Sequence, residues 1–77
     1  MNYNDKVITM DNGEKYIVIE QVDYNGKTYL YLINKEDNKD AIFVEIKNDN
    51  ILKIDPKLFS QHILPLFLEK LSKFNNI

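Results

Sequence analysis

Few side chains in this sequence could perform chemistry, and their spacing brings no set of them together. His62, the only histidine, could act as a general base or bind a metal, but no cysteine or second histidine exists to complete a metal shell. Asp37, Asn38 and Asp40 could hold a hard cation weakly, although this segment lacks the glycine and the terminal glutamate of a calcium-binding loop. We therefore predict no catalytic residue, no metal site and no cofactor, and we interpret His62 as a solvated surface residue.

The charge of the chain is low and slightly acidic. Ten lysines and no arginine are set against twelve acidic residues, for a formal net charge of −2 at pH 7. Arginine supplies the bidentate contacts to phosphates and guanine edges, and nucleic-acid-binding domains present basic surfaces. No apolar run approaches the ~20 residues that cross a bilayer, and the first residues lack the pattern of a secretory signal. These features predict a cytoplasmic protein that binds neither nucleic acid nor a membrane.

The elements that must position any site can be predicted from the turns. Seventy-seven residues suffice for a single domain, 1–77. Asn12-Gly13 and Asn25-Gly26 each separate apolar runs, which is the strongest short signal for a type I′ hairpin turn. Short consecutive strands with tight turns favour an antiparallel meander, so we expect an α+β fold with a four- to five-stranded sheet in residues 1–55. The expected strands cover residues 6–10, 15–23, 28–34, 41–47 and 51–54.

Two-residue turns also predict which residues lie opposite each other and which share a face. The expected pairs are Ile8–Ile17, Val7–Val18, Ile19–Leu32, Val18–Ile33, Glu20–Tyr31, Gln21–Leu30 and Val22–Tyr29. The better core face is aliphatic and carries Ile8, Ile17, Ile19, Leu30, Leu32, Ile42, Val44 and Ile46. The opposite face is mixed and carries Tyr16, Val18, Glu20, Val22, Tyr29, Tyr31, Ile33, Phe43, Glu45 and Lys47. Its three tyrosines either suit an open sheet face or form an interaction surface, because tyrosine is favoured in both settings.

The segment 56–74 is predicted to be a helix that packs on the sheet. Asp55 can cap its first turn, and Pro56 fits the first helical position, where a missing N–H group costs nothing. Pro65 should kink or break the helix near residue 64, since it removes a backbone hydrogen bond inside the helix. The side expected to cover the sheet carries Phe59, Ile63, Phe67 and Phe74.

The apolar arc of this helix is about twice as wide as the stripe of about 100° that one sheet face needs. Leu64, Leu68 and Leu71, here called the leucine ridge, should therefore face water in a monomer. Such a ridge is typical of an interface, either in a homodimer or in the groove of a partner. The alternative is that another part of the fold, such as the N-terminal strand or a bend at Pro65, covers it.

Residues 10–59 resemble a known family. The segments that carry the resemblance are Asp11-Asn12-Gly13-Glu14-Lys15-Tyr16, Tyr24-Asn25-Gly26-Lys27-Thr28-Tyr29-Leu30-Tyr31-Leu32, Ala41-Ile42-Phe43-Val44-Glu45-Ile46 and Leu52-Lys53-Ile54. Their order is similar to that of the short acidic proteins of low-GC Gram-positive bacteria in domain-of-unknown-function family 1292. The last 22 residues depart from that family, whose corresponding segment is strongly acidic, whereas here it is apolar and slightly basic. The resemblance implies no established activity, catalytic residue or cofactor.

Three functional hypotheses follow. The first is a non-enzymatic protein–protein interaction module, which docks through the leucine ridge, the tyrosine face or both. The second is a phage or mobile-element inhibitor that blocks a host nucleic-acid-handling protein. An acidic patch that joins Glu36, Asp37, Asp40 and Glu45 would favour it, whereas dispersed acidic residues would favour the first. The third is a small-molecule-binding protein or an accessory enzyme subunit, for which the sequence offers no site residues.

Overall fold

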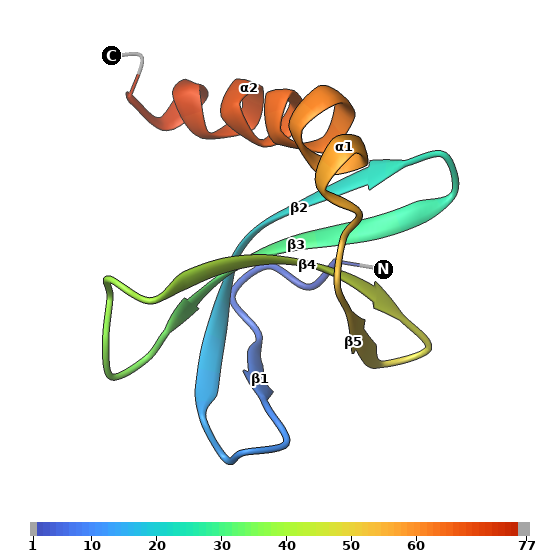
Figure 1. The fold of residues 1–77 in the computed structure, drawn as a ribbon. Helices are drawn as coiled ribbons and strands as arrows, with labels where there is room; N and C mark the ends of the chain where they lie inside the picture. The colour runs from blue at the N-terminus through green and yellow to red at the C-terminus, as the bar shows by residue number, and fades with distance from the viewer. Residues whose placement is uncertain (1, 76–77) are drawn as a thin grey trace.

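The computed structural model describes residues 2–75, with side chains described for residues 2–72. It has an α+β fold, as predicted, in which five antiparallel strands follow one another in the sheet in chain order. The strands are β1 (Val7–Thr9), β2 (Lys15–Tyr24), β3 (Lys27–Asn34), β4 (Ala41–Lys47) and β5 (Asn50–Leu52). The helical segment comprises α1 (Pro56–Leu58), a π-helical turn (Phe59–Ile63) and α2 (Leu64–Asn75). Figure 1 shows the sheet curled into a half-barrel, with the helix lying over its convex face.

The two Asn-Gly turns take different forms. Asn25 and Gly26 both have positive φ angles, 56° and 77°, so the predicted type I′ turn is confirmed between β2 and β3. At the first turn only Gly13 has a positive φ angle, and Met10 N donates to Glu14 O at 2.8 Å. This is a three-residue loop, in which the glycine takes the left-handed position of a bulge. The predicted Ile8–Ile17 pair is therefore wrong, and Ile8 lies opposite Tyr16.

A β-bulge in β2 changes the faces that its residues occupy. The predicted pair Val22–Tyr29 is confirmed, but the register shifts between Val18 and Glu20. Val18 therefore lies opposite Leu32, and the predicted Ile19–Leu32 pair is wrong. The bulge adds one residue to β2. Even-numbered residues before the bulge and even-numbered residues after it therefore point to opposite faces of the sheet. The predicted Val7–Val18 and Val18–Ile33 pairs are also wrong, since Ile17 lies opposite both Val7 and Ile33.

The curled sheet has a core on each face. The concave core is built from Tyr16, Val18, Leu30, Leu32, Val44 and Ile46, with Tyr3, Ile8, Met10, Ile42 and Ile51 packed against it. The convex core joins the sheet to the helix through Val22, Tyr29, Ile63 and Phe67, with Tyr24, Tyr31, Phe43, Ile54, Leu58, Phe59 and Leu66 around them. Tyr16 and Val18 therefore belong to the aliphatic face and not to the tyrosine face. Ile19, predicted to be in the core, is 36% exposed at the bulge.

The helix begins as predicted and continues past Pro65. Asp55 Oδ2 accepts a hydrogen bond from Leu58 N at 3.1 Å, and Pro56 occupies the first turn. The irregularity expected near Pro65 takes the form of the π-helical turn, in which Leu64 N donates to Phe59 O. That turn ends at Ile63, two residues before Pro65, which has no N–H group to donate. Among the described residues, no helix is long and apolar enough to span a membrane.

Candidate protein-binding groove

The first half of β4 forms an open edge of the sheet. Strand β5 pairs only with residues 45–47 of β4, so no described strand lies beside residues 41–44 on that side. Asn34 N donates to Asp40 O at 2.9 Å, and hydrogen-bonded pairs alternate along an antiparallel ladder. The next bonded pair is Leu32–Ile42, so the N–H and C=O groups of Ala41 and Phe43 point away from β3. These backbone groups are available at the open edge.

The edge is open because the chain leaves β4 after β5. Figure 1 shows that the segment after Leu52 rises towards α1 instead of following β4. The helix start requires this path, since Asp55 caps α1 and Pro56 cannot donate a ladder hydrogen bond. Ile54 joins the convex core beneath the helix, which directs the segment to the other face of the sheet.

An apolar cavity of about 780 Å³ lies beside this edge, and we call it the β4 groove. It is lined by residues 41–44 of β4, by Met10, Asn12, Glu14 and Tyr16 of the first hairpin, by residues 51–54, and by Pro56 and Phe59. Its size falls within the range of about 300–1,000 Å³ that is typical of ligand-binding pockets. Leu52 is 40% exposed on its wall, so part of the apolar lining faces solvent. The β4 groove therefore combines a concave apolar surface with free backbone donors and acceptors.

One end of the β4 groove is polar. Tyr16 Oη donates to Asp40 Oδ2 at 2.6 Å and lies 3.4 Å from Glu14 Oε2. Asn34 Nδ2 donates to the same Asp40 oxygen at 3.2 Å. The hydrogen bond to Asp40, followed by burial, raises the pKa of Tyr16 to about 12. The phenol therefore remains a hydrogen-bond donor to Asp40 up to a higher pH than an ordinary tyrosine would.

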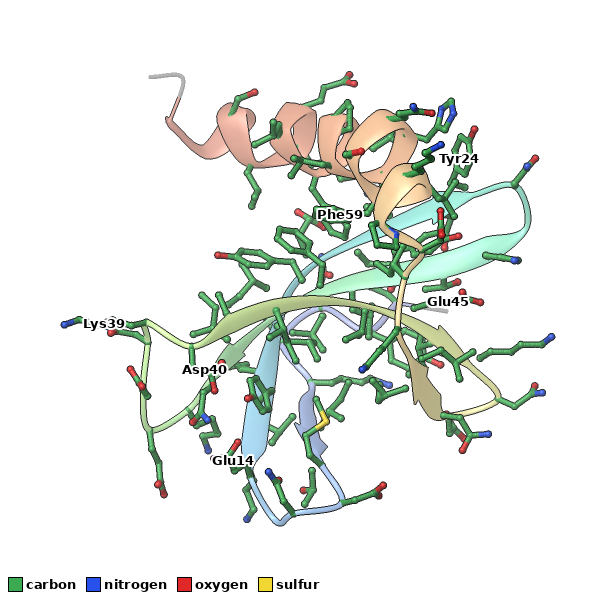
Figure 2. All side chains as sticks on the ribbon, in the orientation of Figure 1. Glu14, Tyr24, Lys39, Asp40, Glu45 and Phe59 are labelled. Carbon is green, nitrogen blue, oxygen red and sulfur yellow. The ribbon has the colours of Figure 1, made fainter. Side chains whose placement is uncertain are left out.

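A second depression, lined by polar residues, adjoins this end. It contains Glu14, Glu36, Asp37 and Asp40 together with the basic residues Lys15 and Lys35. Figure 2 shows Glu14 and Asp40 at one end of the sheet and Glu45 at the other. The acidic patch that would favour an inhibitor is therefore incomplete, because Glu45 is separate and lysines lie among the remaining acids.

The acidic segment is bound within its own loop. Asp37 Oδ1 accepts a hydrogen bond from Lys39 N at 3.0 Å, and Asp37 O accepts one from Asp40 N at the same distance. Among the side chains of residues 2–72, no group of three or more His, Cys, Asp or Glu residues is arranged to hold a metal ion. His62 is exposed, and its ring stacks on that of Tyr24 with centroids 5.6 Å apart.

The tyrosines proposed as an interaction surface lie in two different cores. Tyr16 is buried on the concave face, and Tyr29 is buried beneath the helix on the convex face. Tyr31 is half-buried, with its ring stacked on Phe43 at 4.7 Å. The bulge in β2 separates Tyr16 from the other two, and the helix covers the face that the sequence left open. The structure does not bring the three rings together on an exposed surface.

The leucine ridge is only partly exposed. Leu68 is 56% exposed, while Leu64 and Leu71 are half-buried. Ile63 and Phe67 are fully buried against the sheet, as expected for the covered side of the helix. The predicted contact of Phe74 lies outside the described side chains.

A buried polar network surrounds the bulge and serves the fold. Glu20 Oε1 accepts hydrogen bonds from Gln21 N at 2.9 Å and from Asn4 Nδ2 at 3.0 Å. Gln21 Oε1 accepts one from Tyr3 N at 2.8 Å. Lys70 Nζ on α2 donates to the backbone oxygen of Gln21 at 2.6 Å. These contacts hold the N-terminal segment and the helix to β2.

Sequence reasoning missed the open edge of β4. The sequence offered one signal, the small number of residues between Leu52 and Pro56, which leaves little chain for a long fifth strand. Comparison of the chain with protein-family models, with curated proteins and with solved structures finds no match in any of the three. The resemblance to domain-of-unknown-function family 1292 stays a prediction.

Proposed function

We propose that this chain is a non-enzymatic protein–protein interaction module of the cytoplasm that binds a segment of another protein in the β4 groove. The observation that carries the proposal is the open backbone edge of residues 41–44 beside an apolar cavity. A free strand edge is a ready template for pairing with another chain, and natural proteins usually cover or charge it. Among residues 2–75 no strand covers this edge, and the lining of the groove beside it is mainly apolar.

The shape of the β4 groove supports a single segment as the partner. The groove is walled by β4, by residues 51–54 and by the first hairpin with Met10. If a second copy paired here through its own sheet edge, the other strands of its sheet would also need space beside β4. The first hairpin already occupies that space. We therefore favour one chain segment over edge-to-edge pairing of two copies.

The test uses two exposed leucines that differ in location. A random peptide library is selected on the full chain, and the affinity of the enriched peptides is measured by fluorescence anisotropy. Leu52→Asp places a charge on the groove wall, and Leu68→Asp places the same charge on the outer side of α2. We expect Leu52→Asp to weaken binding at least about tenfold, since burying an unpaired charge costs well over ~1.4 kcal/mol. Leu68→Asp should leave the affinity unchanged.

Two results would contradict the proposal. One is the absence of any peptide that prefers the unmodified chain to Leu52→Asp. The other is a set of peptides that lose affinity with Leu68→Asp and not with Leu52→Asp, which would move the interface to the leucine ridge. Circular dichroism of both variants establishes that each is folded before the comparison.

The size of the β4 groove also favours a second candidate, the binding of a small apolar molecule. A cavity of about 780 Å³ with an apolar lining fits such a ligand. Native mass spectrometry of the purified chain would detect a retained molecule, and its loss in Leu52→Asp would place it in the groove. The free backbone groups of Ala41 and Phe43 have no role in this alternative, which is why we rank it second.

The leucine ridge offers a different arrangement of the same function, a dimer through α2. Leu68 is its only well-exposed member among the described side chains. Sedimentation at high micromolar concentration measures this directly. A dimer that Leu68→Glu converts to a folded monomer would support the arrangement, and a monomeric unmodified chain would remove it.

A further inference from the structure

We infer that the β4 groove accepts its occupant as an extended strand, which adds to the sheet at β4 in line with β5. This inference rests on the proposed function and states the conformation and chemistry of the partner segment. Its backbone would exchange hydrogen bonds with Ala41 and Phe43, the residues whose N–H and C=O groups point to the open edge. Strand addition is a recurring mode of peptide recognition, in which main-chain bonds supply affinity and side-chain pockets supply specificity.

The length of the open edge sets the length of the segment. Residues 41–44 span roughly 13 Å at ~3.3 Å per residue of strand. The segment after Leu52 limits the edge at one end, because β5 already pairs with Glu45. The occupant therefore needs about four or five extended residues beside β4, which the volume of the groove admits.

The lining of the β4 groove sets the pattern of the occupant. Side chains of a strand alternate between faces, so every second residue would point into the concave side towards Ile42 and Val44. Met10 and Ile51 complete that apolar surface from the neighbouring walls. We infer apolar residues at these alternate positions.

Charge distinguishes the two ends of the segment. Glu14 lies at the polar end of the β4 groove, where Tyr16 also binds Asp40, and Lys53 belongs to the lining segment 51–54 that leaves β5. A basic residue on the occupant next to Glu14 would be complementary to these carboxylates, whereas an acidic residue would be repelled. The partner chemistry is thus a short apolar β-strand with a lysine or arginine at the Glu14 end.

The decisive variant removes a single backbone donor. Ala41→Pro deletes the N–H group of Ala41, which faces the open edge and has no role in pairing with β3. Proline is tolerated at the first residue of an edge strand, so the fold should remain. Ala41→Val is the matched control, because it alters the same exposed side chain and keeps the N–H group.

We expect Ala41→Pro to lower the affinity of the selected peptides about fivefold to tenfold, the factor that one backbone hydrogen bond contributes. Ala41→Val should bind as the unmodified chain does. A second measurement uses the peptide and is independent of the fold of any variant. N-methylation of successive peptide residues should reduce affinity at every second position, since only alternate N–H groups face β4.

The outcomes separate this inference from the proposed function. Suppose that Leu52→Asp lowers the affinity of the peptides, while Ala41→Pro and N-methylation at every position leave it unchanged. This result would overturn strand addition and leave the groove as the binding site. If Ala41→Pro fails to fold, the N-methylation series decides alone. The charge assignment is tested by Glu14→Lys, which should weaken a peptide with a basic residue at that end. Equal affinity of Glu14→Lys and the unmodified chain would overturn that assignment.

Discussion

Replacement of Phe67 by alanine would remove a ring that has no exposed surface and lies between the helix and the sheet. The ring of Phe67 meets that of Phe43 edge-on with centroids 5.0 Å apart, and that of Tyr31 at 6.5 Å. A buried Phe→Ala substitution costs about 3–5 kcal/mol of unfolding free energy. A domain of 77 residues has about 4–12 kcal/mol in total, at ~0.05–0.15 kcal/mol per residue. The variant should therefore lose about a quarter or more of its free energy of unfolding.

Urea unfolding followed by far-ultraviolet circular dichroism measures this loss. For a small domain with an m value of ~1 kcal/mol per molar urea, the midpoint should fall by about 3–5 M. Leu68→Ala is the matched control, since the next residue of the same helix is 56% exposed and should change stability by less than about 0.5 kcal/mol. Equal midpoints for the two variants would refute the packing of α2 on the convex face. A loss below about 1 kcal/mol in Phe67→Ala would do the same.

The remaining predictions concern Tyr16, Gly26 and His62. The pKa of Tyr16, about 12 in the folded chain against 10.0 for a free tyrosine, stabilises the folded state below pH 10, and this contribution is lost as the pH rises through 12. Urea unfolding from pH 9 to 12 should therefore show a steeper loss for the unmodified chain than for Tyr16→Phe, and parallel curves would contradict the Asp40 hydrogen bond. Gly26→Ala should cost about 1–2 kcal/mol because of its φ angle of 77°, and an unchanged thermal midpoint would argue against the type I′ turn. His62→Ala should change stability by less than about 0.5 kcal/mol, since only the exposed stacking on Tyr24 is lost, and a larger change in urea midpoint would show a structural role.

Most of the sheet could be predicted because its signals are local. Asn25-Gly26 requires two positive φ angles, and that requirement determined the pairing of Val22 with Tyr29. The bulge at Ile19 had no such signal, because neither glycine nor proline marks it in β2. Contacts distant in sequence hold the bulge, since Val18 bonds Asp5 and Lys6 through its backbone.

The candidate site was harder to predict for the same reason. The residues beside the β4 groove come from the first hairpin, β4, β5 and α1, and none carries an unusual functional group. Their importance lies in the backbone of Ala41 and Phe43, which a sequence does not distinguish from any paired strand. The helix start at Asp55-Pro56 could be recognised, but the direction in which it draws the chain away from β4 could not.

The position of Gln21 has a consequence for the order in which the two cores can form. Among the described residues the concave core includes none beyond Ile51, so it can form before the helix packs on the sheet. Tyr3 can then reach the Gln21 side chain, but the Gln21 carbonyl receives Lys70 only after α2 has docked on the sheet. Until that moment Val22 and Tyr29 lack their cover of Ile63 and Phe67. A half-barrel without its docked helix would thus expose an aromatic face, and a chaperone that recognises apolar surface would have its binding site there.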